Sequence, residues 1–373
     1  MKIPFMRLDR QYAAYKNELD QVVESVFSSG KVLQGPDVKN FETRLANISQ
    51  MKSAIAVGSG TDALSIAMKA LGLSNGGHVA VTSLSFVASA SSIVNAGGVP
   101  IFLDIDENYL SRTDSILDLL DKHLLEGIIL VHLYGQMIDT EVICRKAKSK
   151  GVFVIEDAAQ ALGAKHKGKT PGTYSDAACY SFDPTKVVGA YGSGGGIVTN
   201  DEQIALRCQS LRYHGQSQRG VFSEVGLNSQ MHSVQAAMLE KKLDFYVDWE
   251  KKRQEIARQY TDTITNFTDF KAPKVAQNNN HIYHKYVINA GSSRDRLMNY
   301  LNKKGIGTAI HYAKPLNKQP CFSQYIDHQF IDLRGVEKLA DEVVSLPIYP
   351  ELLEEEIEYI INALKSFMKN QKD

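Results

Sequence analysis

Short, nearly continuous apolar runs alternate with longer amphipathic segments over the first 200 residues of the chain. A run that is apolar at successive positions is typical of a strand covered on both faces, and strands separated by helices predict a parallel sheet. Ligands on such a sheet bind beyond the carboxyl ends of the strands, so the residues after each run are candidates for a site. The predicted strands are 54–57, 79–82, 100–104, 127–132, 152–155 and 197–199.

The pattern changes near residue 239, where apolar positions mix with many charges and predict one long connecting helix over 239–258. We therefore predict two domains, a large one over 1–244 that begins with an N-terminal arm and a small one over 245–373. The helices predicted in the large domain cover 10–27, 37–48 and 141–150. The small domain is predicted to contain strands over 283–288 and 307–311 and helices over 295–303 and 352–368.

Composition narrows the class of protein. The chain has 373 residues with 42 Lys+Arg and 42 Asp+Glu, and this zero net charge argues against non-specific binding to nucleic acid or anionic membranes. The four cysteines lack metal-type spacing, so we predict no metal site and a reducing compartment. The first residues lack the apolar region of a signal peptide, and no apolar run reaches the roughly 18 residues of a membrane span. We therefore expect a cytoplasmic protein.

Two polar side chains beside predicted strands indicate the chemistry. Lys186 lies between an apolar run and the glycine-rich turn 192–196, and Asp157 follows the apolar run 152–155. A lysine amine can form a Schiff base with the aldehyde of pyridoxal phosphate, and a carboxylate can partner the pyridinium nitrogen. Taken singly, each residue is more often a surface lysine or a helix-capping aspartate.

The turn over 58–61, Gly-Ser-Gly-Thr, follows a predicted strand and opens a predicted helix. Amides at a helix N-terminus attract an anion, and glycine lets a phosphate approach the backbone closely. The turn lacks the Gly-Lys-Ser/Thr of a P-loop and the full dinucleotide fingerprint. A nicotinamide dehydrogenase is the alternative for any chain of alternating strands and helices, but no Gly-x-Gly-x-x-Gly follows a predicted strand here. A plain strand–helix connection also remains open.

Taken together and in order, the motifs of nearly the whole chain resemble the DegT–StrS group of sugar-nucleotide aminotransferases. This resemblance implies an α/β protein of pyridoxal phosphate fold type I, which is aspartate aminotransferase-like. Its large domain has a mostly parallel sheet and binds the cofactor, and its C-terminal domain is small and α/β. The motifs are Leu33–Pro36, Gly58–Leu64, Phe86–Ala88, His132–Gln136, Glu156–Ala161, Ser181–Phe182 with Lys186, Val198–Asp201, Asn228–Ser229, Gln235–Ala237 and Ile310–Tyr312.

The resemblance implies roles around the cofactor ring. Lys186 would carry the cofactor and then, once its amine is freed, move the proton as general acid and base. Asp157 would keep the pyridinium nitrogen protonated, so that the ring remains an electron sink. Phe86 would lie flat on the ring, and Gln160 would hydrogen-bond its phenolic oxygen. A core phenylalanine is the alternative for Phe86.

The phosphate and the substrate would be held by further residues that the resemblance implies. Ser59 and the backbone amides of Gly60 and Thr61, with the Ser181 hydroxyl, would hold the phosphate. Asn228 would reach the cofactor phosphate of the neighbouring subunit, which predicts a homodimer with shared active sites. The residues predicted to contact substrate are His311, Tyr312, Arg219 and Asp183. A structural role is equally open for His311.

The implied reaction transfers an amino group from glutamate to a keto-sugar nucleotide. Segments 214–216 and 315–320 are most similar to members that aminate carbon 3 of a dTDP- or UDP-linked hexose. The product would enter a surface polysaccharide, such as lipopolysaccharide, or another glycoconjugate. Amination at carbon 4 and a sugar-nucleotide-binding protein with impaired activity are alternatives. The family also includes dehydratases, but these carry histidine in place of the lysine, so Lys186 argues against a dehydratase.

Three positions depart from the family pattern. Gln230 replaces a usual arginine, and the loss of that guanidinium leaves open how the carboxylate of glutamate, or of an acidic sugar, is held. Arg219 could substitute for it. Asp183 stands where an aromatic residue is usual, and Ser193 where aspartate is typical. Together they indicate an unusual substrate or donor, or an impaired enzyme.

Overall fold

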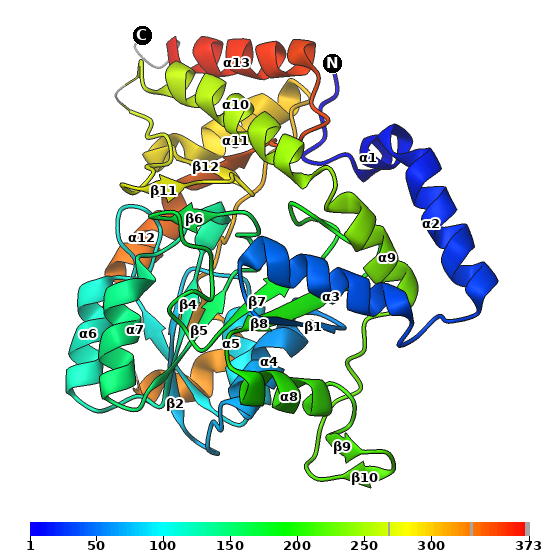
Figure 1. The fold of residues 1–373 in the computed structure, drawn as a ribbon. Helices are drawn as coiled ribbons and strands as arrows, with labels where there is room; N and C mark the ends of the chain where they lie inside the picture. The colour runs from blue at the N-terminus through cyan, green and yellow to red at the C-terminus, as the bar shows by residue number, and fades with distance from the viewer. Residues whose placement is uncertain (268, 329–330, 370–373) are drawn as a thin grey trace.

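A seven-stranded sheet forms the centre of the protein in the computed structural model, which describes residues 1–267, 269–328 and 331–369 (Figure 1). The strand order is β1-β8-β7-β5-β4-β2-β3. Strand β8 is antiparallel to both neighbours, and the other neighbouring pairs are parallel. The strands are β1 (Ser53–Val57), β2 (His78–Thr82), β3 (Val99–Leu103), β4 (Gly127–Val131), β5 (Phe153–Asp157), β7 (Ala177–Ser181) and β8 (Gly195–Thr199). The carboxyl ends of β1, β5 and β7 therefore meet at one edge, and the predicted fold class is confirmed.

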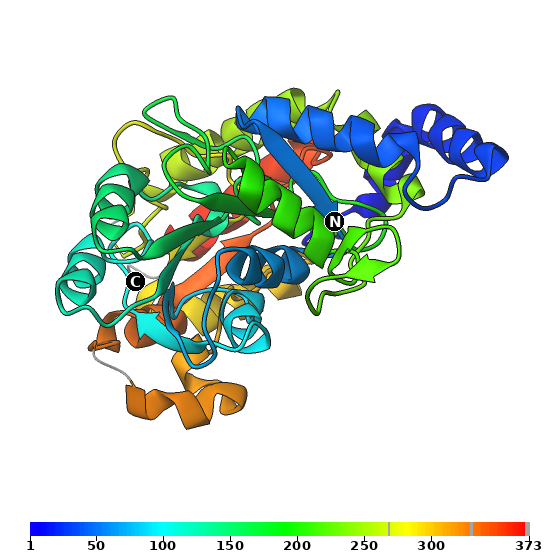
Figure 2. The same ribbon diagram turned by 60° about the horizontal axis from the view of Figure 1, so that its bottom comes forward.

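Helices cover both faces of this sheet, which explains the continuous apolar runs in the sequence. Alternate residues of β1 enter different clusters, with Ile55 and Val57 in one and Ala54 and Ala56 in the other. Figure 2 shows α3 and α4 on opposite sides of β1. The helices packed around the sheet are α3 (Pro36–Ser49), α4 (Gly60–Ala70), α5 (Ala88–Asn95), α6 (Thr113–Asp121), α7 (Thr140–Ser149), α8 (Glu202–Leu211) and α9 (Ser233–Lys242).

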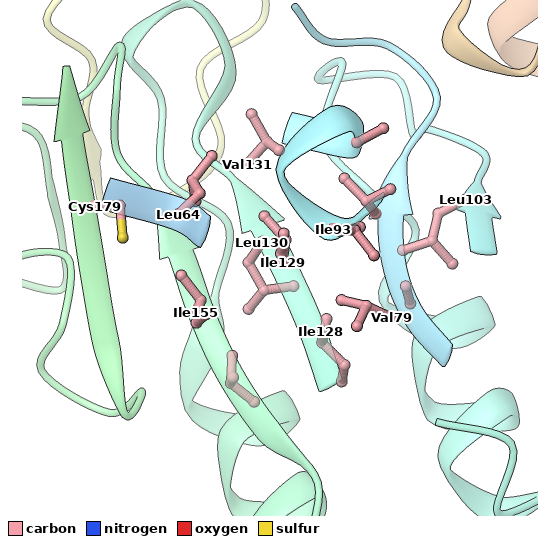
Figure 3. Close-up of a cluster of buried hydrophobic side chains, with 14 of the residues drawn as sticks. Leu64, Val79, Ile93, Leu103, Ile128, Ile129, Leu130, Val131, Ile155 and Cys179 are labelled. Atoms are coloured by element: carbon pink, nitrogen blue, oxygen red, sulfur yellow. The ribbon is translucent and has the colours of Figure 1, made fainter. Parts of the chain in front are cut away.

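The larger cluster of buried side chains lies over β2, β3, β4 and β5. In Figure 3, Leu64 of α4 and Ile93 of α5 point toward strand residues such as Ile129. All of these side chains are at most 2% exposed. This packing fixes α4 against the sheet, so the start of α4 is held at the edge where the strands end.

A second, smaller core lies beside the sheet, at the top of Figure 1. Strands β12 (Tyr286–Asn289) and β13 (Val343–Leu346) pair antiparallel, and helices pack around them. Helix α10 joins the two parts, because Trp249 belongs to a cluster on the sheet and Ile256 to the small core. We propose the domain boundary at 244/245, just before this helix. Helices α10 (Tyr246–Ile264), α11 (Arg294–Lys303) and α13 (Glu354–Lys369) pack in this core, whereas α12 (Arg334–Glu342) packs against the sheet through Val336.

The N-terminal arm crosses to this small core. Ile3 is fully buried there and pairs with Ile306, and the Gly307 amide donates to the Ile3 carbonyl at 2.8 Å. The chain then forms α1 (Leu8–Ala14) and α2 (Lys16–Ser29) before it returns to the sheet. Residues 10–27 thus form two helices that meet at Tyr15, rather than the single predicted helix.

Two further sequence predictions differ from the structure. The single helix predicted over 239–258 is interrupted between α9 and α10 at residues 243–245. The strand predicted over 307–311 is absent from the described residues, where the segment is held instead by an isolated bridge between Ala309 and Ser345. Among the described residues, none of the helices is both long and apolar enough to cross a membrane.

A short hairpin, β9 (Gln216–Gln218) and β10 (Val221–Phe222), projects from the sheet domain at the bottom of Figure 1. Val221 and Phe222 are exposed on it. The remaining short pair joins β6 (Lys165–His166) to β11 (Asn279–Asn280). The 3-10 segments are Leu133–Gly135, Gly291–Ser293, Leu316–Lys318 and Pro320–His328.

Candidate active site

A cavity of about 540 Å³ lies between the edge where β1, β5 and β7 end and the segments that flank the small core. We call it the Lys186 cavity. Of the residues predicted from sequence, all but Asn228 and Arg219 line it. Those lining residues are Ser59, Gly60, Thr61, Phe86, Asp157, Gln160, Ser181, Asp183, Lys186, His311 and Tyr312.

Asp157 is the last residue of β5 and is 5% exposed. The Ser89 hydroxyl donates to Oδ2 at 2.7 Å, and the Ala159 amide donates to Oδ1 at 3.1 Å. Ser89 is in turn 2.8 Å from the Ser85 hydroxyl. Each carboxylate oxygen thus accepts a bond that fixes its direction, while the side chain still lines the cavity.

Lys186 follows β7 in a turn that Asp183 stabilises. The Lys186 amide donates to the Asp183 carbonyl at 2.9 Å, and the Asp183 carboxylate accepts from the Thr185 amide and hydroxyl. Burial lowers the pKa of Lys186 from its usual value, and the charges of Asp157 and Asp183 oppose that shift. Lys186 and Asp157 line the same cavity. A depressed pKa supplies the neutral amine that a nucleophile requires.

The start of α4 forms a cradle that fits a phosphate. Ser59 caps the helix by accepting from the Asp62 amide at 3.1 Å, so the first amides, those of Gly60 and Thr61, have no carbonyl partner within their helix. A Cβ at Gly60 would lie 2.7 Å from the Ser181 Cβ, so only glycine permits this close approach. The cradle therefore combines amide donors, a helix N-terminus and the Ser181 hydroxyl. These residues fit pyridoxal phosphate.

Gln160 and Tyr312, which also line the cavity, belong to a network of hydrogen bonds. The Gln160 side chain accepts from the Tyr134 amide at 2.9 Å and donates to the Tyr312 hydroxyl at 3.0 Å. The Tyr134 hydroxyl donates to the His311 carbonyl. Phe86 is 55% exposed, with its ring centroid 6.4 Å from that of Tyr312. The network ties the sheet edge to the segment around residue 311.

His311 is held as a neutral ring. Its Nδ1 is 2.8 Å from the Ser345 hydroxyl, and its ring stacks on Phe5 at 5.6 Å. Burial, and then the nearby charges of Lys285 and Lys186, lower the pKa of His311 to about 3. A neutral imidazole can accept or donate a hydrogen bond to a ligand without adding charge to the cavity.

Asn228 and Arg219 lie outside the Lys186 cavity of this single chain. Arg219 is in the turn of the exposed β9–β10 hairpin, and Asn228 is exposed beside Gln230. The Gln230 side-chain Nε2 donates to Asn228 Oδ1 at 3.1 Å, and its Oε1 accepts from Gln34 Nε2 at 2.5 Å. The roles predicted for Arg219 and Asn228 remain predictions. A larger depression of about 990 Å³ lies beside Gln230, and neither Lys186 nor Asp157 lines it.

Sequence reasoning did not select Lys285 or His284, which both line the cavity just before β12. Lys285 is 7% exposed and His284 is 3% exposed. The sequence signal was a histidine followed by a lysine inside the strand predicted over 283–288, at positions that a buried strand usually fills with apolar residues. The N-terminal arm also contributes, since Phe5 and Met6 line the same cavity.

Comparison with known proteins places the chain in a family. Residues 13–365 match the DegT/DnrJ/EryC1/StrS aminotransferase family. A protein of Geobacillus stearothermophilus named pleiotropic regulatory protein is 38% identical, covering 99% of this chain and 100% of that protein. The UDP-2-acetamido-2-deoxy-3-oxo-D-glucuronate aminotransferase of Pseudomonas aeruginosa is 35% identical, covering 97% and 99% respectively.

Solved structures agree with the sequence match. DesV of S. venezuelae, solved in complex with a ketimine intermediate, has a TM-score of 0.92 and is 30% identical over 98% of both chains. The family match, the fold and the cavity around Lys186 and Asp157 all coincide over the same part of the chain. The resemblance seen in the sequence is thereby confirmed. The chain belongs to the DegT/DnrJ/EryC1/StrS aminotransferase family, whose members depend on pyridoxal phosphate.

Proposed function

We propose that this protein transfers an amino group from glutamate to carbon 3 of a UDP- or dTDP-linked keto-hexose. The observation that carries the proposal is that Lys186, Asp157 and the cradle at α4 line one cavity. The carbon-3 assignment is supported by the relative named for a 3-oxo sugar nucleotide, which this chain matches over nearly its whole length. The product would serve surface polysaccharide or other glycoconjugate synthesis.

When bound, pyridoxal phosphate supplies an electron sink that stabilises negative charge on the amino-bearing carbon. Asp157 would hold a proton at the ring nitrogen. The hydrogen bond from Ser89 fixes the orientation of the Asp157 carboxylate in the cavity. The amides of Gly60 and Thr61, Ser59 and the Ser181 hydroxyl would bind the phosphate. Gln160 would donate to the phenolic oxygen, and Phe86 would cover the ring.

Lys186 would act twice. Its Nζ first holds the cofactor, and afterwards moves the proton as general base and acid. Burial lowers the pKa of Lys186 from its usual value, which favours the neutral amine that both tasks require. His311, Tyr312 and Asp183 line the same cavity and would contact the sugar.

We also propose a homodimer in which Asn228, and with it Arg219, contacts the cavity of the partner. Both residues are exposed in the single chain and lie near the apolar residues Val221, Phe222 and Val225 of the projecting hairpin segment. An exposed apolar segment of this kind is typical of a surface that another chain covers.

The first experiment mixes the purified protein with pyridoxal phosphate. We expect near-visible absorbance from lysine-bound cofactor that is lost in Lys186→Ala, and bleaching by glutamate with release of 2-oxoglutarate. Asp157→Asn should retain the absorbance but lose at least about 100-fold in the rate of bleaching, because a neutral amide no longer holds the ring proton. Absorbance that persists in Lys186→Ala would contradict the assignment.

The second arm identifies the acceptor. Keto-sugar nucleotides with the ketone at carbon 3 or carbon 4, each as UDP and dTDP forms, are incubated with enzyme and glutamate. Mass spectrometry should detect an amino sugar nucleotide from the 3-keto compounds. Formation from the 4-keto compounds alone would replace the carbon-3 assignment with amination at carbon 4.

A further inference from the structure

Lys285 is a buried cation without an anionic partner among the residues that the structure describes. The residue is 7% exposed and lines the Lys186 cavity, and its ammonium takes part in none of the side-chain hydrogen bonds or ion pairs of the described part of the chain. Its ammonium lies 5.2 Å from the centre of the Phe5 ring, which covers it on one side. A buried charge without a partner is unfavourable and rare outside functional sites.

The surroundings of Lys285 are positive. Burial, and then the charges of Arg253 and Lys186, lower the pKa of Lys285 to about 7, and only the charge of Asp183 opposes them. Asp183 already accepts two bonds from Thr185. Arg253 is held by the carbonyls of Tyr283 and Ile348. The positive charge at this position is therefore best compensated by an anion that comes from outside the chain.

A second unsatisfied group lies beside Lys285. The Nδ1 atom of His284 is buried and has no hydrogen-bond partner, and this residue also lines the cavity. The cavity lining contains two residues with permanent or titratable ammonium charge, Lys186 and Lys285. Under the proposed function Lys186 is committed to the cofactor, so Lys285 remains to receive an acidic group.

We propose that Lys285 binds a carboxylate of an acidic substrate in the Lys186 cavity. A compact ammonium with three donors suits one carboxylate, whereas a diphosphate carries more charge than one lysine neutralises. The carboxylate could belong to the amino donor or to a uronic acid sugar, and the experiment distinguishes the two. The inference rests on the proposed function, because Lys186 is free for substrate unless the cofactor occupies it.

The test measures binding to the cofactor-loaded protein by calorimetry, with ligands that cannot react. Glutarate mimics the donor's two carboxylates without an amine. UDP-glucuronate and UDP-glucose form a pair that differs in one carboxylate. The variants are Lys285→Met, which removes the charge at similar length, and Lys285→Arg, which restores it. Lys304→Met is the matched control, because Lys304 also lies over an aromatic ring, Tyr300 at 5.3 Å, but is exposed and outside the cavity.

We expect Lys285→Met to weaken glutarate binding at least tenfold if the donor supplies the carboxylate. If the sugar supplies it, the same variant abolishes the preference for UDP-glucuronate over UDP-glucose. Lys285→Arg should restore most of the lost affinity in either case, and Lys304→Met should match the wild type. The near-visible absorbance of the cofactor should remain in all variants.

Two outcomes would overturn the inference. One is unchanged binding of both glutarate and UDP-glucuronate in Lys285→Met. The other is an equal loss for UDP-glucose, which would assign Lys285 to the diphosphate. In both cases wild-type cofactor absorbance would leave the proposed function standing, whereas a wild-type protein without that absorbance would refute the proposed function itself.

Discussion

At the residue scale, the buried ammonium of Lys285 should lower the free energy of unfolding of this protein. Its pKa is about 7 in the folded protein and 10.5 when free, so the unfolded chain binds more protons between these values. The destabilisation is therefore fully present below pH 7 and fades as the pH rises toward 10.5. We expect Lys285→Met to raise the free energy of unfolding at pH 7 by on the order of 2–4 kcal/mol.

Denaturant titrations of wild type and Lys285→Met at pH 7 and pH 9, without acidic ligands, check this prediction. The stability difference between the two proteins should shrink from pH 7 to pH 9. The neighbouring histidines do not contribute to the trend, because burial keeps the pKa of His311 at about 3 and that of His284 well below its usual value. Lys186, whose pKa burial also lowers, is present in both proteins, so the comparison between them isolates Lys285. A wild type as stable as the variant at pH 7 would show that the lysine is not desolvated.

The sequence predicted the residues of this site unevenly, for a physical reason. Asp157 and Lys186 were found because a charge after a continuous apolar run must sit at the end of a buried strand. Lys285 was missed because it lies inside the strand predicted over 283–288, where alternate side chains can face solvent, and its burial depends on Phe5, 280 residues away. Local pattern does not reveal contacts at that separation.

At the element scale, the junction between α4 and β7 depends on Gly60. An added Cβ would lie 2.7 Å from the Ser181 Cβ, so Gly60→Ala should separate the helix start from Ser181. We expect at least tenfold weaker binding of pyridoxal phosphate. Thr61→Ala is the matched control, because it retains the backbone amide, and its affinity should stay within about threefold of wild type. Spectral titration with the cofactor measures both, and equal affinities in the two variants would count against a backbone cradle.

The same scale shows where sequence patterns suffice for the fold. Six of the seven strands of the sheet were predicted, all but β7, because helices cover both faces and leave continuous apolar runs. The break between α9 and α10 was not predicted, because apolar residues such as Phe245 and Trp249 continue the helical spacing through it. Residues 307–311 resembled a strand but are held by the hydrogen bond from the Gly307 amide to Ile3 of the arm and by one isolated bridge from Ala309 to β13. Such tertiary pairing is not encoded in the local pattern.

At the scale of the whole molecule, the proposed homodimer with shared active sites predicts complementation between inactive variants. Lys186→Ala and Asn228→Asp would each be inactive alone if Asn228 serves the partner's cavity. In a heterodimer of the two, one of the two sites regains both intact residues. Random mixing makes half of the dimers mixed, so we expect about a quarter of wild-type activity.

Activity assays after co-refolding or co-expression of the two variants measure this, with sedimentation to establish the dimer. A mixture of Lys186→Ala with Asp157→Asn is the control, because both residues line the same cavity in one chain. Its mixed dimers hold no site with both residues intact and should show no recovery. Equal recovery in the two mixtures would contradict a shared site.

The attachment of the N-terminal arm has a practical consequence for work with this protein. Met1 is exposed, while Ile3 is anchored and Phe5 forms part of the wall around Lys285. A purification tag fused ahead of Met1 would be attached only four residues before Phe5. Kinetic constants should therefore be compared before and after removal of such a tag, since a tag that strains the arm would alter substrate affinity while leaving the cofactor spectrum unchanged.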